Sequence, residues 1–245
     1  MATPHAKLPP PAAAHQVHRP SLKDAAAAYI RDLIFNGHLL PGERIDQDAV
    51  AETLGVSKLP VREALITLEA AALVDIVPRR GSFVAQITKD DLVDHYRIYA
   101  SIEMIAAERA AETLNSAGIE TLRRNITEMR TTPDGAAREK LNHDFHRIIN
   151  QAGGSRRLHV LIKGLEAMMF ADFYRADDGW TGRAADDHHK IAEALERHDG
   201  ATAAETMRRH IIDGGAYAIA VLEQRGFWRT SDADRLRTPA SRTRG

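Results

Sequence analysis

The fold of the N-terminal part can be inferred from residues 41–85, PGERIDQDAVAETLGVSKLPVREALITLEAAALVDIVPRRGSFVA. It holds two short segments whose apolar residues recur at the spacing of an α-helix. Asp46 and Ser57 precede these segments and are of the residue types that cap helix starts, while Gly55 between them permits a tight reversal. Ser21 is a third such cap, for a helix that precedes the stretch. We therefore expect three short helices in succession.

The third of these helices has two distinct faces. Val61, Leu65 and Leu68 form an apolar stripe, whereas Lys58 and Arg62, four residues apart, lie on a different face. This helix follows another one through a short glycine-containing turn, and it carries cations in its first turns. A helix of this kind has the shape and charge to enter the major groove of DNA. The residues expected to reach base edges and phosphates are Ser57, Lys58 and Arg62.

A hairpin is expected after the third helix. Residues 73–77 and 82–86 are rich in β-branched and aromatic side chains, unlike their alanine-rich neighbours, and they are the only strands that the pattern predicts. The turn between them, residues 78–81, carries Arg79 and Arg80. A tight turn would present these arginines to a phosphate backbone or to the neighbouring minor groove, so the hairpin is predicted to be a wing.

Charge limits how such a segment could bind DNA. Residues 21–88 contain seven Lys and Arg residues against nine Asp and Glu residues, so the segment is not basic as a whole. Binding would depend on a local cluster of four cations, Lys58, Arg62, Arg79 and Arg80. The alternative is that these cations are an ordinary solvated surface.

The composition of the whole chain is that of a globular protein. Of its 245 residues, 44% are hydrophobic, 27% are charged and 5% are aromatic, and the formal net charge is −1. The absence of cysteine excludes disulfides, thiolate metal sites and a cysteine nucleophile, and it favours a reducing compartment. No apolar run has the length of a membrane helix or a signal peptide, so we expect a cytoplasmic protein with no membrane partner.

The chain is predicted to have four parts. Residues 1–20 hold half of the ten prolines and are expected to form a disordered arm, and residues 226–245 are expected to form a disordered tail with five arginines. Between them, residues 21–88 are the helices and the hairpin, and residues 89–225 consist of one helical pattern after another. The junction is expected near residues 87–90.

The second domain, residues 89–225, is predicted to be an all-α bundle. Gly, Pro and Asn separate its amphipathic segments, and no strand is needed. We expect helices at residues 91–114, 119–130, 136–151, 156–175, 183–196 and 202–225. Because the cores of bundles are common ligand sites, the polar residues that face inward are the informative ones.

Two histidines near the end of the bundle are predicted to face its core. His188 shares a stripe with apolar side chains, whereas its neighbour His189 falls among glutamates and should face solvent. His210 also lies on an apolar stripe, one turn before Gly214, which would allow a close helix approach.

Two further polar residues, Asn142 and His146, lie four residues apart beside an apolar face. Together with the two inward histidines they make three imidazoles and one amide oxygen from three helices, a set that a divalent transition metal accepts. The alternative is that each histidine is a hydrogen-bonded core residue.

Residues 41–85 resemble the winged helix-turn-helix of GntR-family transcription regulators. The resemblance implies that operator DNA is contacted by the cap hydroxyl, the basic residue after it and the arginine of the VREAL segment, with a glycine at the tip of the wing. These positions are Ser57, Lys58, Arg62 and Gly81. Lys58-Leu59 stands where Arg-Thr is usual, and Asp48 stands where some members place a DNA-contacting arginine. Because lysine cannot make the bidentate guanine contact of arginine, the operator sequence does not carry over.

The second domain is similar to the FCD ligand-sensing domain that accompanies such a winged domain. The segments that carry the similarity are NHDFHRIINQAGG (142–154), DHHKIAEALERHD (187–199) and MRRHI (207–211). The similarity implies a divalent transition metal, zinc or nickel. Its ligands would be Asn142, His146, His188 and His210. Asn142 replaces the more frequent aspartate, so the charge of the cation is less compensated.

The same resemblance implies an organic acid as effector, bound to the metal. Many members hold a carboxylate with an arginine four residues before a glutamate in the first helix of this domain. Aligned on Glu103, that position is Tyr99 here, and Arg97 lies two positions away. Tyr99 and Arg97 are therefore the candidate effector contacts.

These features predict a mainly α-helical, dimeric, ligand-responsive regulator of transcription that is not an enzyme. It is expected to be a repressor whose two winged domains bind a pseudo-palindromic operator and are released or repositioned by a small carboxylate. One alternative is a metal-dependent, hydrolase-like enzyme with Asp144 or Asp187 as base, although no HExxH, Gly-x-Ser-x-Gly or phosphate-loop motif is present. The other is a DNA-binding dimer without a sensing site.

Overall fold

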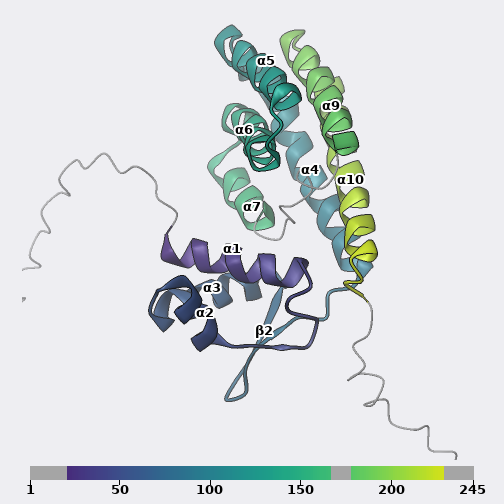
Figure 1. Cartoon of the computed structure of the whole chain (residues 1–245). Coiled ribbons are helices and arrows are strands. Elements are labelled where there is room, and N and C mark those ends of the chain that lie inside the picture. Colours follow the sequence, from purple (N-terminus) through teal and green to yellow (C-terminus); the bar gives the residue numbers. More distant parts are fainter. Residues whose placement is uncertain (1–20, 167–177, 229–245) are drawn as a thin grey trace, which may run out of the picture.

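The computed structural model describes residues 21–166 and 178–228, which form a small winged part and a helical bundle (Figure 1). The predicted fold class, a mainly α-helical chain with a winged helix-turn-helix followed by a bundle, is confirmed. The elements of the winged part are α1 (Leu22–Phe35), β1 (Arg44–Ile45), α2 (Gln47–Leu54), α3 (Lys58–Ala70), β2 (Val74–Val77) and β3 (Gly81–Val84).

The predicted helix signals of the winged part stand where expected. Ser21, Asp46 and Ser57 are the N-cap residues of its three helices, and Gly55 ends α2 in a left-handed conformation with φ of 64°. The apolar stripe of α3 is buried against α1, because Val61, Leu65 and Leu68 each have at most 1% of their surface exposed. Burial of this stripe leaves the opposite face of α3 toward solvent.

Within the described residues the sheet has three strands rather than the two predicted. It is antiparallel in the order β1-β3-β2, with Arg44 opposite Phe83 and Ile45 opposite Ser82. The expectation that strands occur only in the hairpin was therefore wrong. A strand of two residues is too short to show the alternation of a strand, and it forms only because β3 offers an edge to pair with.

The bundle contains the six predicted helices. They are α4 (Lys89–Thr113), α5 (Ser116–Thr131), α6 (Gly135–Gly153), α7 (Arg156–Glu166), α9 (Asp178–Glu196) and α10 (Gly200–Gln224). α4 begins at the expected junction, where the Thr88 hydroxyl and the Asp91 carboxylate form a reciprocal capping box. The helix predicted at residues 156–175 can be followed only to Glu166, since residues 167–175 lie outside the described residues.

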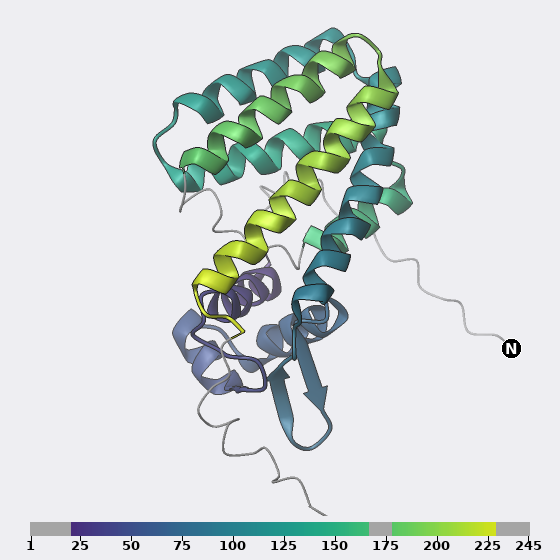
Figure 2. The same cartoon turned by 90° about the vertical axis from the view of Figure 1, so that its right-hand side faces the viewer.

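The two longest helices, α4 and α10, run side by side along the bundle (Figures 1 and 2). A Cβ atom on Gly215 would lie 2.4 Å from Cγ of Tyr96 on α4, so the close approach requires glycine there. At Gly214 a Cβ would lie at an ordinary 3.4 Å from the Trp180 ring. The close approach predicted at Gly214 is therefore made by its neighbour, because Gly215 is the one that faces α4.

The segment that follows α10 packs against the winged part. Phe227 has 2% of its surface exposed, and the indole nitrogen of Trp228 donates a 2.9 Å hydrogen bond to the carbonyl oxygen of Ile87. The prediction that the disordered tail starts at Gly226 was therefore wrong for residues 226–228, whose partners are distant in sequence. The rest of the predicted tail and the predicted arm, residues 1–20, lie outside the described residues.

Candidate functional site

Three histidines meet in the core of the bundle. His146 comes from α6, His188 from α9 and His210 from α10, and they have 5%, 0% and 3% of their surface exposed. One ring nitrogen of each lies within 4.8 Å of the other two, and the Nε2 atoms of His188 and His210 are 3.3 Å apart. The side chain of His189 is 57% exposed, so the first of the two adjacent histidines faces the core and the second faces solvent, as the helical spacing predicted.

Two carboxylates contact the outer sides of these rings. Glu103 of α4 is 0% exposed, and its Oε2 lies 3.4 Å from Nδ1 of His146 while its Oε1 accepts a 2.7 Å hydrogen bond from Asn150. Oδ2 of Asp187 lies 3.7 Å from Nδ1 of His210. A carboxylate beside the outer nitrogen of a histidine orients the ring and leaves the inner nitrogen free to bind a metal.

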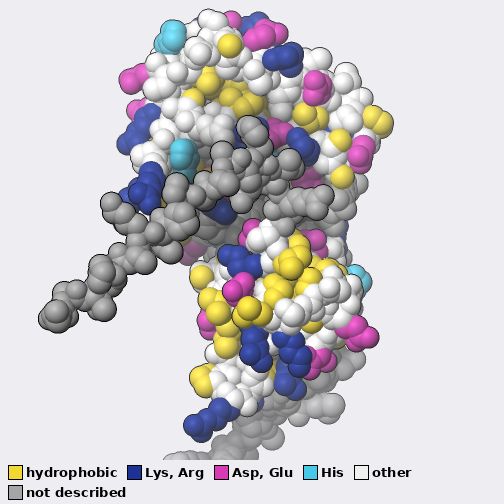
Figure 3. Space-filling model, turned by 90° about the vertical axis from the view of Figure 1, so that its left-hand side faces the viewer, with side chains coloured by type: hydrophobic (Ala, Val, Ile, Leu, Met, Phe, Trp, Pro, Cys, Tyr) yellow, Lys and Arg dark blue, Asp and Glu magenta, His cyan; other side chains and the backbone are white. Residues whose placement is uncertain are grey.

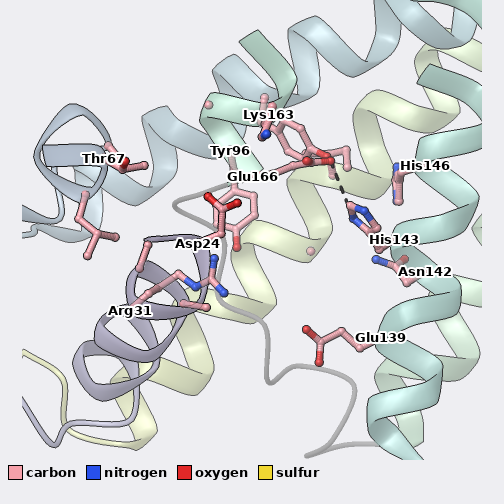
Figure 4. A pocket seen from close by; sticks show the side chains of 18 of the residues that line it. Asp24, Arg31, Thr67, Tyr96, Glu139, Asn142, His143, His146, Lys163 and Glu166 are labelled. Atoms are coloured by element: carbon pink, nitrogen blue, oxygen red, sulfur yellow. Dashed lines mark ion pairs between the residues drawn. The ribbon is translucent and has the colours of Figure 1, made fainter. Parts of the chain in front are cut away.

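Asn142 lies one turn before His146 on α6, and both face the same cavity (Figure 4). Its Oδ1 is buried and accepts no hydrogen bond from the part of the chain that the structure describes. Buried polar atoms without a partner are uncommon, and a cation would satisfy this one. Three imidazoles with an amide oxygen are a donor set that fits zinc or nickel.

Burial favours the neutral form of two of the site histidines, His188 and His210. It lowers the pKa of His188 well below its usual range, and the neighbouring His210 and His146 act in the same direction. Burial also lowers the pKa of His210, against the opposing influence of Asp187. A neutral imidazole has a free lone pair, which is the form that binds a metal.

A cavity of about 940 Å³ opens beside the histidines and extends to the winged part (Figure 4). Its wall includes residues of α1 and α3 as well as residues of the bundle. Glu166 of α7 also faces it, and burial together with the nearby Glu103 raises the pKa of the Glu166 carboxyl to about 7. The cavity therefore joins the candidate metal ligands to the first helix of the winged part.

The two candidate effector contacts lie in different places. Tyr99 lines the cavity with 2% of its surface exposed, and burial, then the Glu103 carboxylate, raises the pKa of its phenol. Arg97 lies outside the cavity wall, where its side chain is 71% exposed and pairs with Asp94 at 3.9 Å. Two residues along a helix correspond to a rotation of about 200°, so Arg97 points away from the face of Tyr99. The structure does not support an effector contact at Arg97.

Sequence reasoning did not anticipate the acidic residues around the site. Glu103 lies on the same face of α4 as several buried alanines. Its position on that face could have indicated a buried charge. Asp187, one of the two candidate bases of the enzyme alternative, lies beside His210. Glu166 reaches the cavity through the packing of α7, and no local pattern marks it.

The residues predicted to contact DNA lie on the surface of the winged part. Ser57 caps α3 from an extended backbone, yet its hydroxyl makes no capping hydrogen bond with the described part of the chain. Arg62 is exposed. The side chain of Lys58 is 58% exposed, and its Nζ lies 2.5 Å from Oδ1 of Asp48 on α2. The departure from the family pattern at Asp48 therefore places an acid against one of the cations that are predicted to contact DNA.

The turn of the wing exposes its two arginines. Arg79 has φ of 63°, and Gly81 has φ of 113°, a conformation that side chains rarely adopt. The guanidinium of Arg80 lies 5.9 Å from the centre of the Phe83 ring. Figure 3 shows Lys and Arg side chains on one face of the winged part with acidic side chains among them, in keeping with the balanced charge count.

The chain matches two known family models. Residues 22–84 match that of bacterial regulatory proteins of the gntR family, and residues 94–213 match that of the FCD domain. This chain belongs to the GntR family. The GntR match contains the predicted DNA contacts, and the FCD match contains the four predicted metal ligands. Within the described residues, no helix of this GntR-family chain combines the length and apolar character needed to cross a membrane.

Two curated relatives of this GntR-family chain are named as transcription regulators, which agrees with the prediction of a regulator and not an enzyme. It is 27% identical over 147 residues to the uncharacterized HTH-type transcriptional regulator Rv0043c of Mycobacterium tuberculosis (strain ATCC 25618 / H37Rv), a match that spans 60% of each chain. It is 25% identical over 195 residues to the HTH-type transcriptional repressor RspR of Escherichia coli (strain K12), covering 78% of this chain and 86% of that one. Among solved structures it is similar to E. coli McbR/YncC, with a TM-score of 0.65, 23% identity, and coverage of 84% of this chain and 99% of that one.

Proposed function

We propose that this GntR-family chain is a ligand-responsive regulator of transcription, a repressor, that binds a pseudo-palindromic operator as a homodimer. A divalent transition metal, zinc or nickel, holds a small carboxylate effector in the FCD domain, and effector binding releases or repositions the winged domains. The metal ligands in this proposal are Asn142, His146, His188 and His210. Because bacterial operators lie in the cytoplasm, the protein acts there.

The observation that carries this proposal is the meeting of three buried imidazoles, with Oδ1 of Asn142 one helical turn from His146 and without a partner among the described residues. If the histidines only filled the core, one hydrogen bond between His188 and His210 would account for their 3.3 Å contact but would leave Oδ1 of Asn142 unsatisfied. One cation accounts for all four groups. This favours a sensing site over a helical half that serves only to dimerise.

The charge of the ligand set supports an anionic effector. Three neutral imidazoles and a neutral amide leave the charge of a divalent cation uncompensated. A carboxylate at an open coordination position would compensate it, and the cavity beside His146 and Asn142 gives such a group access. When bound, the metal supplies an electrophilic position for the carboxylate.

The exposed cations of the winged part support binding to DNA. Lys58 and Arg62 begin a helix whose other face is buried, and Arg79 and Arg80 stand on the adjacent turn. A pair of such domains reading two half-sites requires a dimer. The name of the E. coli relative, a transcriptional repressor, supports the repressor role.

Metal analysis of protein purified without a histidine tag tests the site. We expect about one equivalent of zinc or nickel per chain after loading, and a higher melting temperature than for the apoprotein. His188→Ala should lose both effects, whereas His189→Ala, which removes the exposed neighbour, should keep them. A wild-type chain that neither retains metal nor is stabilised by it would contradict the sensing site.

A footprint on the DNA that flanks the protein's own gene, with organic acids titrated in, tests the regulatory role. We expect protection of two half-sites and a change in protection when an effective acid is added. His188→Ala should keep the footprint and lose the response to acid. Failure of the wild-type chain to protect any such DNA, with or without acid, would contradict the proposal.

A further inference from the structure

We infer that Arg31 binds one end of the effector while the metal site binds the other, so that the effector is an elongated dicarboxylate in contact with both halves of the protein. This inference rests on the proposed function, because it takes the metal site as one anchor. It adds the chemical class of the effector and a direct route from effector binding to the winged part.

The cavity has the position and the size that this requires. Figure 4 shows Arg31 of α1 and His146 of α6 on opposite sides of one cavity of about 940 Å³. Cavities that hold drug-sized ligands measure roughly 300–1,000 Å³, so this one lies near the top of the range. A short-chain acid held at the metal would leave most of the space unfilled. A longer molecule is needed to reach the winged part.

Arg31 presents unused donors to this cavity. Its side chain is 20% exposed and its Nε is buried, yet its guanidinium makes no hydrogen bond within residues 21–166 and 178–228. The ion pair with Asp32 is long, with 3.8 Å between Nε and Oδ1. A guanidinium offers planar, paired donors that match a carboxylate, so an anionic group of the ligand would satisfy it.

The charges on the cavity wall leave room for an anion at the α1 end. The cationic residues of the wall are Lys23, Arg31, Lys140 and Lys163, and the acidic ones are Asp24, Glu139 and Glu166. Lys140 is neutralised by Asp144 at 2.6 Å. Asp24 lies near Arg31 and stays ionised, because a hydrogen bond with Ser21 and the charges of Lys23 and Lys163 lower the pKa of its carboxyl. The same two lysines offset its negative charge, which leaves Arg31 for an anion of the ligand. Glu139 and Glu166 belong to bundle helices.

A ligand with two anionic ends couples the two halves. The metal ligands belong to the bundle and Arg31 belongs to α1, so a dicarboxylate binds most tightly to the arrangement in which both ends reach their partners. A monocarboxylate makes only the contact with the metal and lacks this preference. Linkage makes this coupling reciprocal. If the dicarboxylate changes the affinity of the protein for operator DNA by some factor, operator DNA changes the affinity for the dicarboxylate by the same factor.

Calorimetry on the full chain, purified without a tag and loaded with zinc, tests this inference. The probes are straight-chain dicarboxylates from succinate to sebacate, each compared with a monocarboxylate of the same chain length. For a limited range of lengths we expect the dicarboxylate to bind about tenfold more tightly or better, which is the effect of one charge-assisted hydrogen-bonded pair. These dicarboxylates should also change the affinity for the operator.

Variants of Arg31 identify the second anchor. Arg31→Ala should abolish the preference for dicarboxylates and keep monocarboxylate affinity within about twofold. Arg31→Lys should retain part of the preference, because an ammonium keeps the positive charge but lacks the planar pair of N–H donors of a guanidinium. Arg124→Ala, which removes an exposed arginine of α5, is the matched control and should behave as wild type. Circular dichroism checks folding, and Arg31→Gln replaces Arg31→Ala if the latter is unfolded.

The outcomes separate this inference from the proposed function. If wild type binds monocarboxylates at zinc but prefers no dicarboxylate, or if Arg31→Ala keeps the preference, the inference is overturned and the metal-bound effector stands. If the zinc-loaded chain binds no carboxylate of either kind, the proposed effector and this inference both fall.

Discussion

The ring of Phe227, three residues beyond the end of α10, lies 6.0 Å from the ring of Phe35 at the end of α1. Both side chains have only 2% of their surface exposed. Beside them Arg225 donates a 2.7 Å hydrogen bond to Oδ1 of Asn36. The helix that carries His210 is therefore attached to the winged part at its C-terminal end.

Phe227→Ala should destabilise the protein by about 3 to 5 kcal/mol, because it removes a buried aromatic ring and leaves a cavity. Trp228→Phe keeps a ring but loses the hydrogen bond to Ile87, and it should cost about 1 kcal/mol. Denaturant unfolding measures both values. A Phe227→Ala chain as stable as wild type would mean that this contact does not hold in solution.

Gly215→Ala and Gly214→Ala should differ sharply although they are neighbours. The first forces a methyl group against the Tyr96 ring and should cost about 1 to 3 kcal/mol by overpacking. The second has ordinary contact distances to Trp180 and should be neutral or stabilising by up to about 1 kcal/mol, since alanine favours helices. Melting temperatures of the two variants check the packing of α4 on α10, and equal values would contradict it.

Asp48→Asn should strengthen binding to operator DNA, because it releases Lys58 and removes a negative charge that a phosphate would meet. Stability should change by less than about 1 kcal/mol, since the ion pair is exposed. Arg62→Ala should weaken binding to operator DNA. It should also reduce the slope of log affinity against log salt concentration by about one. Fluorescence anisotropy at several salt concentrations measures both, and weaker binding by Asp48→Asn would contradict the groove assignment.

Asn142→Asp should make the metal harder to remove, because a carboxylate compensates the charge of the cation where the amide does not. We expect the affinity for zinc to rise on the order of tenfold, equivalent to about 1.4 kcal/mol. Competition with a chelator measures the affinity. An unchanged value would show that residue 142 is not a ligand.

The stability of the metal-free protein should fall as the pH drops from about 6.5 to about 4. His95 of α4 is 6% exposed, and burial lowers its pKa to about 4, whereas an unfolded histidine titrates near 6.5. In this window the unfolded chain binds a proton that the folded chain does not, which favours unfolding. His95→Gln should reduce the loss of unfolding free energy between about pH 7 and about pH 5, whereas the exposed His189→Gln should not. Identical pH profiles for wild type and His95→Gln would disprove the assignment.

Much of the winged part could be predicted because its signals are local. Asp46 as a cap, Gly55 in the left-handed conformation and the stripe that includes Val61 each depend on a few neighbouring residues. The same spacing separated inward His188 from outward His189, because successive residues of a helix point about 100° apart.

Other features arise from contacts between distant segments. Arg44–Ile45 becomes a strand only through β3, and Phe227 is buried only through Phe35, so neither shows a local pattern. The packing of α10 against α4 decides that Gly215, and not Gly214, makes the close approach. The sequence of α10 by itself does not show which of two adjacent glycines faces the other helix.

Spacing within one element was enough to predict most of the helices, the apolar faces they bury and the side chains that offer ligand atoms or positive charge. The tertiary structure alone decided that three imidazoles lie within 4.8 Å of one another, that Glu103 stands behind His146, and that Arg31 faces the same cavity. These relations join elements far apart in the chain, and the packing of whole helices sets their distances.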